Sequence, residues 1–241
     1  MKLDEMTMLK PLLDSHLFEA VLLTHDKSGR TNASAVGFFP DRSGAAIRPS
    51  LYFVLYYGSN TFINLERLDV SKGSEKPIIS INIIHPSKLH MLLRAGLYGE
   101  RNHENEFEDD EYYTTDDGSI PYLKETQAVL LAELNSISLA AHHDEYGDTK
   151  VLKCTCSVEE VMLLDESIPL EPISRNRHPL IGVAIDATRY RIAAGSLKAE
   201  LEEKIYSGLQ NIQDSHPLSP AEKASMELIM EYLEKIDSSK A

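Results

Sequence analysis

Apolar positions in the first part of the chain alternate or run together over short segments, as is typical of β-strands. Residues 17–26 and 30–40 flank the turn DKSG and predict a β-hairpin. A third strand is expected over residues 46–57. Pro49 donates no backbone N–H, so this part of the third strand is expected at a sheet edge or a bulge.

Beyond residue 57 the apolar spacing becomes helical. Phe62, Leu65 and Leu68 fall on one face of a predicted helix over residues 60–68. A continuous apolar strand follows, then a short helix, and then two long strands joined by HHDEYGD; their ranges are 77–84, 87–97, 126–140 and 149–164. About six strands linked by hairpins and short helices indicate a closed or partly closed barrel.

The pattern changes near residues 168–174, after which three helical segments follow over 177–193, 196–212 and 219–236. Ser219-Pro220 with Glu222 three residues after the serine predicts a capped start for the last helix. We therefore divide the chain into a barrel, residues 1–168, and a C-terminal helical region, residues 169–241. Helical spacing alone assigns no function to that region.

Composition limits the classes of partner. Of 241 residues, 42% are apolar and 26% charged, which is an ordinary globular mixture, and the formal net charge is −14. Such a surface repels nucleic acids and anionic lipids, so neither is an expected partner. No secretory signal or membrane-spanning run is visible, which favours a cytoplasmic protein.

The two cysteines, Cys154 and Cys156, fall on one face of a predicted strand and are expected to be buried thiols in a reducing cytoplasm. The acidic segment 100–118 is expected to be a solvated surface loop, with calcium binding as the alternative. His142 and His143 have no partner at metal-ligand spacing, so no metal site is expected.

The common signatures of nucleotide-binding, metalloprotease and hydrolase sites are absent from the sequence: GxGxxG, GxxxxGK[ST], HExxH, CxxC and GxSxG. What remains is YYGSNT, residues 56–61, at the start of the first predicted helix. Gly58 permits a close backbone approach, and Ser59, Asn60 and Thr61 surround unpaired N–H groups that favour an anion. Helix capping by Ser59 or Asn60 explains the same pattern and stays open.

A second unusual stretch is TNASAVGF, residues 31–38, where small and polar residues replace the expected apolar alternation. A flat ring system could lie against such a smooth strand and take hydrogen bonds from its backbone. Close packing of the strand on another element is the alternative explanation.

These two stretches resemble motifs of an archaeal family of FMN-binding split-barrel proteins. TNASAVGF resembles the family's N-A-A-P-x-G strand, and YYGSNTFINL its Y-x-G-S-x-T-Y-x-N-L segment. The family's strand with a central asparagine is similar to PIISINII. The segment in which the family's barrel resumes after a variable loop is similar to PYLKETQAVLLAEL. The helix that opens the family's C-terminal region is similar to NRHPLIGVAIDATRY. The chain departs from the family at two places. It has Ser34-Ala35 where the family usually has alanine-proline, and Gly182 where the family often has glutamate.

The resemblance implies a six-stranded Greek-key split barrel that forms a homodimer, with one FMN per subunit near the dimer interface. It places Ser59 and Thr61 at the FMN phosphate with Asn60 nearby, and Thr24 at the polar edge of the isoalloxazine ring. The other residues assigned to the cofactor are Asn32, Ala33, Ser34, Ala35 and Val36 along the ring, Asn82 in the same cleft, and Tyr57 and Gly58 of the YYGSNT segment.

The leading function is a flavin reductase-like oxidoreductase that uses bound FMN for hydride or electron transfer, with NADH or NADPH as a candidate electron donor. FMN itself supplies hydride and electron transfer, so the lack of an evident acid–base pair fits this class. Two alternatives remain: an FMN carrier or sensor without turnover, and an interaction protein whose helical region is the working part.

Overall fold

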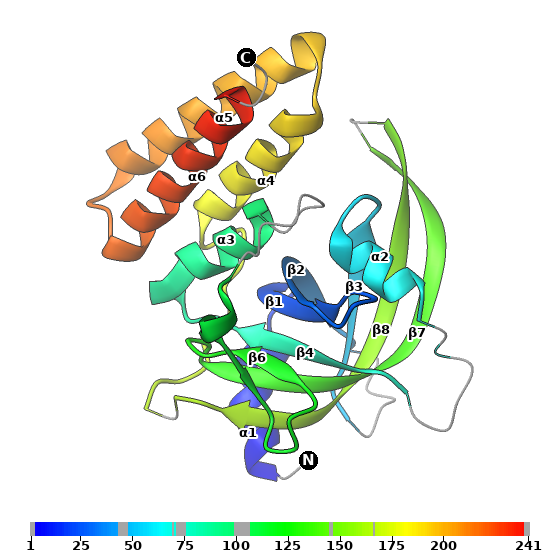
Figure 1. Cartoon of the computed structure of the whole chain (residues 1–241). Coiled ribbons are helices and arrows are strands. Elements are labelled where there is room, and N and C mark those ends of the chain that lie inside the picture. The colour runs from blue at the N-terminus through cyan, green and yellow to red at the C-terminus, as the bar shows by residue number, and fades with distance from the viewer. Residues whose placement is uncertain are drawn as a thin grey trace.

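The computed structural model describes residues 3–42, 48–68, 70, 76–98, 107–144, 147–165 and 167–238. Six antiparallel strands close a barrel in the order β1-β2-β3-β8-β7-β4 (Figure 1). They are β1 Phe18–His25, β2 Thr31–Pro40, β3 Ser50–Tyr56, β4 Ile78–Ile83, β7 Ala128–Asp144 and β8 Gly147–Leu163. The predicted six-stranded barrel is therefore confirmed. Because β3 begins at Ser50, Pro49 lies just before the strand, where its carbonyl accepts a hydrogen bond from Val158.

The barrel interior is filled by alternate side chains of its strands, with Phe38 packed between Phe18 and Phe53. Cys154 and Cys156 of β8 belong to this core as free thiols, and burial raises the pKa of each to about 12. The expected buried thiols are thus confirmed.

Two helices complete the same core. The helix α1, Leu3–Leu13, was not predicted; its Leu9 and Leu12 are fully buried against barrel residues. The helix α2, Asn60–Glu66, confirms the helix predicted after residue 57 and contributes Phe62 and Leu65.

The strands β7 and β8 each run for 17 residues and pair along almost their whole length. The pairing reaches His142↔Thr149 and His143↔Asp148, so the predicted loop HHDEYGD is mostly strand, and only residues 145 and 146 of it lie outside the described part. Figure 1 shows this hairpin curving up beyond the rest of the barrel beside α2.

The three predicted C-terminal helices are present as α4 Pro179–Ile192, α5 Gly195–Ser215 and α6 Pro220–Ser238. The predicted cap of α6 is confirmed, because Ser219 Oγ accepts from the Glu222 amide at 3.2 Å and Glu222 Oε2 accepts from the Ser219 amide at 2.8 Å. None of the described helices is long and apolar enough to cross a membrane.

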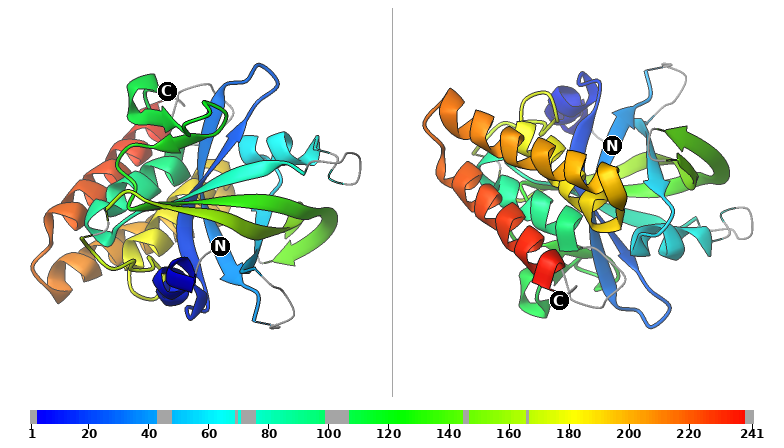
Figure 2. Two further views of the ribbon diagram at one scale, coloured as in Figure 1. Left: turned by 90° about the horizontal axis from the view of Figure 1, so that it is seen from below. Right: turned by 90° about the horizontal axis from the view of Figure 1, so that it is seen from above.

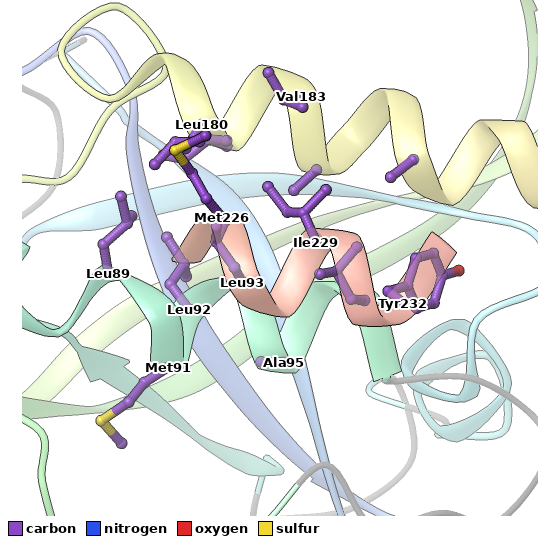
Figure 3. Packing of buried hydrophobic residues seen from close by; sticks show 14 of the residues in the cluster. Leu89, Met91, Leu92, Leu93, Ala95, Leu180, Val183, Met226, Ile229 and Tyr232 are labelled. Atoms are coloured by element: carbon purple, nitrogen blue, oxygen red, sulfur yellow. The ribbon is translucent and has the colours of Figure 1, made fainter. Parts of the chain in front are cut away.

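The helical region shares a core with α3, Leu89–Tyr98, which lies between β4 and the next strands in the chain. Figure 3 shows Leu92 and Leu93 of α3 beside Met226 and Ile229 of α6, with α4 above them. The same cluster includes Val21, Leu23 and Ala33, which come from β1 and β2. Both views in Figure 2 place the helices as a layer along one side of the barrel.

The acidic segment only partly matches the expected loop. Residues 100–106 lie outside the described residues, whereas Asp109–Glu111 form a 3₁₀ turn that leads into a small hairpin of β5 Tyr112–Thr114 and β6 Pro121–Leu123. Glu111 pairs with Arg94 of α3 through two contacts of 2.9 and 3.0 Å, so this part is tied to the helices. Within the described residues, no group of three or more potential ligand side chains could hold a metal ion.

Candidate functional site

The barrel is closed, but β2 and β3 pair over only a short stretch, which leaves an opening in the ladder beside residues 31–37 of β2. These strands pair at Phe38↔Phe53, Phe39↔Tyr52 and Pro40↔Leu51, whereas β2 pairs with β1 from Phe18↔Phe38 to His25↔Thr31. Residues 31–37 of β2 therefore have a partner strand on one side and none of the β3 ladder on the other. The helix α2 faces this opening, since its side chains bond to β2.

A buried polar cluster joins α2 to β2 at the opening. Asn32 Nδ2 donates to Thr61 Oγ1 at 2.9 Å, and the Thr61 hydroxyl donates to Ser34 Oγ at 2.6 Å. All three side chains are at least nine-tenths buried, and Thr61 is wholly so. The Asn32 carboxamide oxygen is buried without a hydrogen-bond partner among the described residues. An orphaned buried acceptor costs free energy unless something donates to it, which fits a site for a ligand that carries N–H or O–H groups.

A second buried contact lies next to this cluster. Asn64 Nδ2 of α2 donates to Thr24 Oγ1 of β1 at 3.1 Å, and Thr24 pairs with Asn32 in the sheet. The predicted residue Thr24 is therefore adjacent to Asn32. Asn64 was missed by the sequence analysis; the signal that could have found it is a polar residue within the buried face of the predicted helix.

The start of α2 explains part of the Ser-Asn-Thr pattern. Ser59 is the N-cap, and its hydroxyl accepts from the Phe62 amide at 3.1 Å, so the capping interpretation is confirmed for this residue. Gly58 precedes it with φ +112°, a conformation that side chains rarely adopt. Ser59 and Asn60 are half-buried, but the Thr61 hydroxyl points inward to Ser34 rather than to the surface with them.

The small residues of β2 divide between two faces. Val36 belongs to the barrel core, whereas Ala33 and Ala35 pack against the helical cluster. A Cβ added at Gly96 of α3 would lie 3.3 Å from the Ala35 Cβ, so helix and strand approach closely here. Close packing therefore accounts for the alanines, and the polar cluster accounts for Asn32 and Ser34.

The remaining predicted residues lie at different distances from the cluster. Tyr57 is exposed at the start of α2, with its ring edge-on to Phe62 at 5.4 Å between centroids. Asn82 of β4 is not brought together with the others. Its amide donates to Ser80 Oγ at 3.0 Å and its oxygen accepts from the Leu123 amide at 2.8 Å, so it connects β4 to β6.

Comparison with known proteins adds a structural likeness. No family model matches the chain, and no curated protein matches it. An FMN-bound protein from Methanosarcina mazei is similar in structure with a TM-score of 0.61 at 20% sequence identity, covering 92% of this chain and 97% of that chain.

Two further solved structures are similar at lower TM-scores. A flavin reductase domain protein from Arthrobacter gives a TM-score of 0.46 at 13% identity, covering 68% of this chain and 88% of that chain. A flavoredoxin from Methanosarcina acetivorans gives a TM-score of 0.44 at 15% sequence identity, covering 65% of this chain and 74% of that chain. The likeness to the M. mazei protein, which extends over nearly the whole of both chains, shows that this chain has the fold of that protein, a six-stranded barrel with C-terminal helices.

Proposed function

We propose that the protein is an FMN-binding flavoprotein of the flavin reductase-like type. The observation that carries the proposal is the buried cluster of Asn32, Ser34 and Thr61 on the part of β2 outside the β3 ladder, where the Asn32 oxygen has no donor among the described residues. The ligand-bound state of the M. mazei protein, which has the same fold, supports FMN as the ligand.

In this proposal the isoalloxazine ring lies along residues 32–36 of β2, with Thr24 near its polar edge. The phosphate lies at the start of α2, beside Gly58, Ser59 and Asn60, where the first backbone N–H groups have no carbonyl partner within the helix. Thr61 acts through its neighbours, because its hydroxyl fixes both Asn32 and Ser34. Directed donors are required here because a chain of net charge −14 does not attract a phosphate by its overall field.

When bound, FMN supplies hydride and electron transfer. The residues of the chain bind and orient it. The Asn32–Thr61–Ser34 bonds hold the strand against α2, and the apolar side chains of Phe62 and Leu65 keep the interior behind the cluster free of water. The chain thus provides a scaffold for the cofactor. The cluster of Asn32, Ser34 and Thr61 itself contains no charged residue.

Turnover separates the oxidoreductase from an FMN carrier or sensor. We expect the FMN-loaded protein to oxidise NADH or NADPH, measured as loss of absorbance of the nicotinamide, faster than free FMN at the same concentration. Bound FMN without such oxidation would favour the carrier or sensor. A protein that binds no FMN at all would favour the third class, an interaction protein that works through its helical region.

We also propose a homodimer. Exposed tyrosines lie along β3 and directly after it, namely Tyr52, Tyr56 and Tyr57. An obligate homodimer interface that includes them is expected to bury more than about 2,000 Å² in total. Light scattering should therefore give twice the chain mass of 27.0 kDa at micromolar concentration. A mass that stays monomeric as the concentration rises would contradict this.

A further inference from the structure

The helix α2 makes two buried polar contacts with the barrel, and the second of them involves Asn64. The first contact is that of Thr61 with Asn32 and Ser34 of β2. In the second, Asn64 Nδ2 donates to Thr24 Oγ1 of β1 at 3.1 Å. Residues three apart lie on the same face of a helix, so α2 presents Thr61 and Asn64 to the strands together. The two contacts are neighbours, because Thr24 pairs with Asn32 in the sheet.

The direction of the hydrogen bond between Asn64 and Thr24 determines what the Thr24 hydroxyl can still do. A carboxamide NH₂ group only donates, so the Thr24 oxygen is the acceptor and its own proton remains to be donated. Thr24 is 5% and Asn64 3% exposed, and the Thr24 hydroxyl donates to no other group among the described residues. A buried hydroxyl whose proton has no acceptor favours a ligand that carries one.

There is room for a ligand atom beside this hydroxyl. Thr24 and Asn64 both line a cavity of about 200 Å³ at the end of α2. No carboxylate belongs to the lining residues that the structure describes, so no anionic acceptor from the protein competes there for the Thr24 proton. The unpartnered oxygen of Asn32 does not accept it either. The acceptor is therefore left for a ligand to supply.

We infer that Asn64 is a positioning residue of the cofactor site. By occupying the Thr24 oxygen, it keeps the Thr24 hydroxyl as a hydrogen-bond donor to an acceptor atom at the polar edge of the isoalloxazine ring. The inference rests on the proposed FMN function, in which the ring lies along residues 32–36 of β2, next to Thr24. The carbonyl oxygens and nitrogens of that edge gain electron density when the ring is reduced. A hydroxyl that donates to them therefore favours reduced FMN over oxidised FMN.

The test compares the affinities of the full-length protein for oxidised FMN and for FMN reduced with dithionite, titrated without oxygen. We expect Thr24→Val and Asn64→Leu each to lower the ratio of the reduced to the oxidised affinity by about three- to tenfold, because a hydrogen bond to a more negative acceptor is the stronger one. Both changes act through one hydroxyl, so the double variant should lower the ratio no further. Thr24→Ser keeps the hydroxyl and should keep the ratio near its native value.

A purely structural role of Asn64 would weaken the binding of both forms equally and leave the ratio unchanged. The control is Asn135→Leu, which removes a bond of the same kind between β7 and β8, from Asn135 Nδ2 to Ser157 Oγ at 2.7 Å, and should not alter the ratio. If FMN binds but the ratio stays unchanged in Asn64→Leu, the inference is overturned while the FMN function stands. If the native protein binds neither form of FMN, the proposed function fails and the inference fails with it.

Discussion

The Phe62→Ala variant is expected to lose about 3–5 kcal/mol of unfolding free energy, the usual cost of removing a buried aromatic ring. Phe62 is fully buried in the barrel core, and it anchors a helix of only seven residues. A helix this short is not stable in water without tertiary packing. Urea denaturation of the FMN-free protein measures the change, and FMN affinity should fall with it because α2 carries half of the proposed site.

The matched control is Ile63→Ala in the same helix. The Ile63 side chain is 40% exposed, so its removal should change stability by no more than about 0.5 kcal/mol. Equal losses in the two variants would mean that α2 does not pack into the barrel through the face described above.

The Thr61→Val variant keeps the side-chain shape but removes the hydroxyl between Asn32 and Ser34. Leaving a buried polar group without its partner costs about 1–3 kcal/mol, so stability should fall by that amount. Because Asn32 and Ser34 then lose their fixed positions along β2, we expect FMN to bind roughly ten- to a hundredfold more weakly. Chemical denaturation without FMN and a fluorescence titration with FMN measure the two effects separately.

Thr155→Val is the control for this change, because the Thr155 hydroxyl bonds to Ser136 on the exposed face of the barrel. It should leave both stability and FMN affinity nearly unchanged. If Thr61→Val lowers stability but leaves FMN affinity intact, Thr61 serves packing alone and has no part in holding the cofactor.

The strands and helices that carry a clear apolar period were predictable, as β1, β4 and α4–α6 show. The helix α1 was missed because its Leu9 and Leu12 gain their stability from the barrel core rather than from a strong helical pattern. The strands β5 and β6 have three residues each, too few to show alternation. The pairing of β3 with β8 joins positions about a hundred residues apart, which no local pattern specifies.

Two separate stretches of sequence predicted Asn32, Ser34 and Thr61, and the structure places these residues in one cluster. The direct contact could not be predicted, because it depends on how α2 lies across the opening. Asn82 behaves differently for a reason of strand geometry. It pairs with Val21, which packs against the helices rather than into the barrel, so Asn82 lies on the other face of the sheet from Thr24. Asn64 lies within a helix whose apolar spacing drew attention to its other residues.

The proposed FMN site is tested most directly by a pair of titrations of the purified FMN-free protein, one with FMN and one with riboflavin, followed by flavin fluorescence. The two ligands share the isoalloxazine ring and differ in the phosphate. We expect saturable binding of FMN and much weaker binding of riboflavin. Ser59→Ala should reduce the difference between the two affinities, because the Ser59 hydroxyl lies at the start of α2. Equal affinity for FMN and riboflavin, or no binding of either, would contradict a phosphate position at Gly58, Ser59 and Asn60.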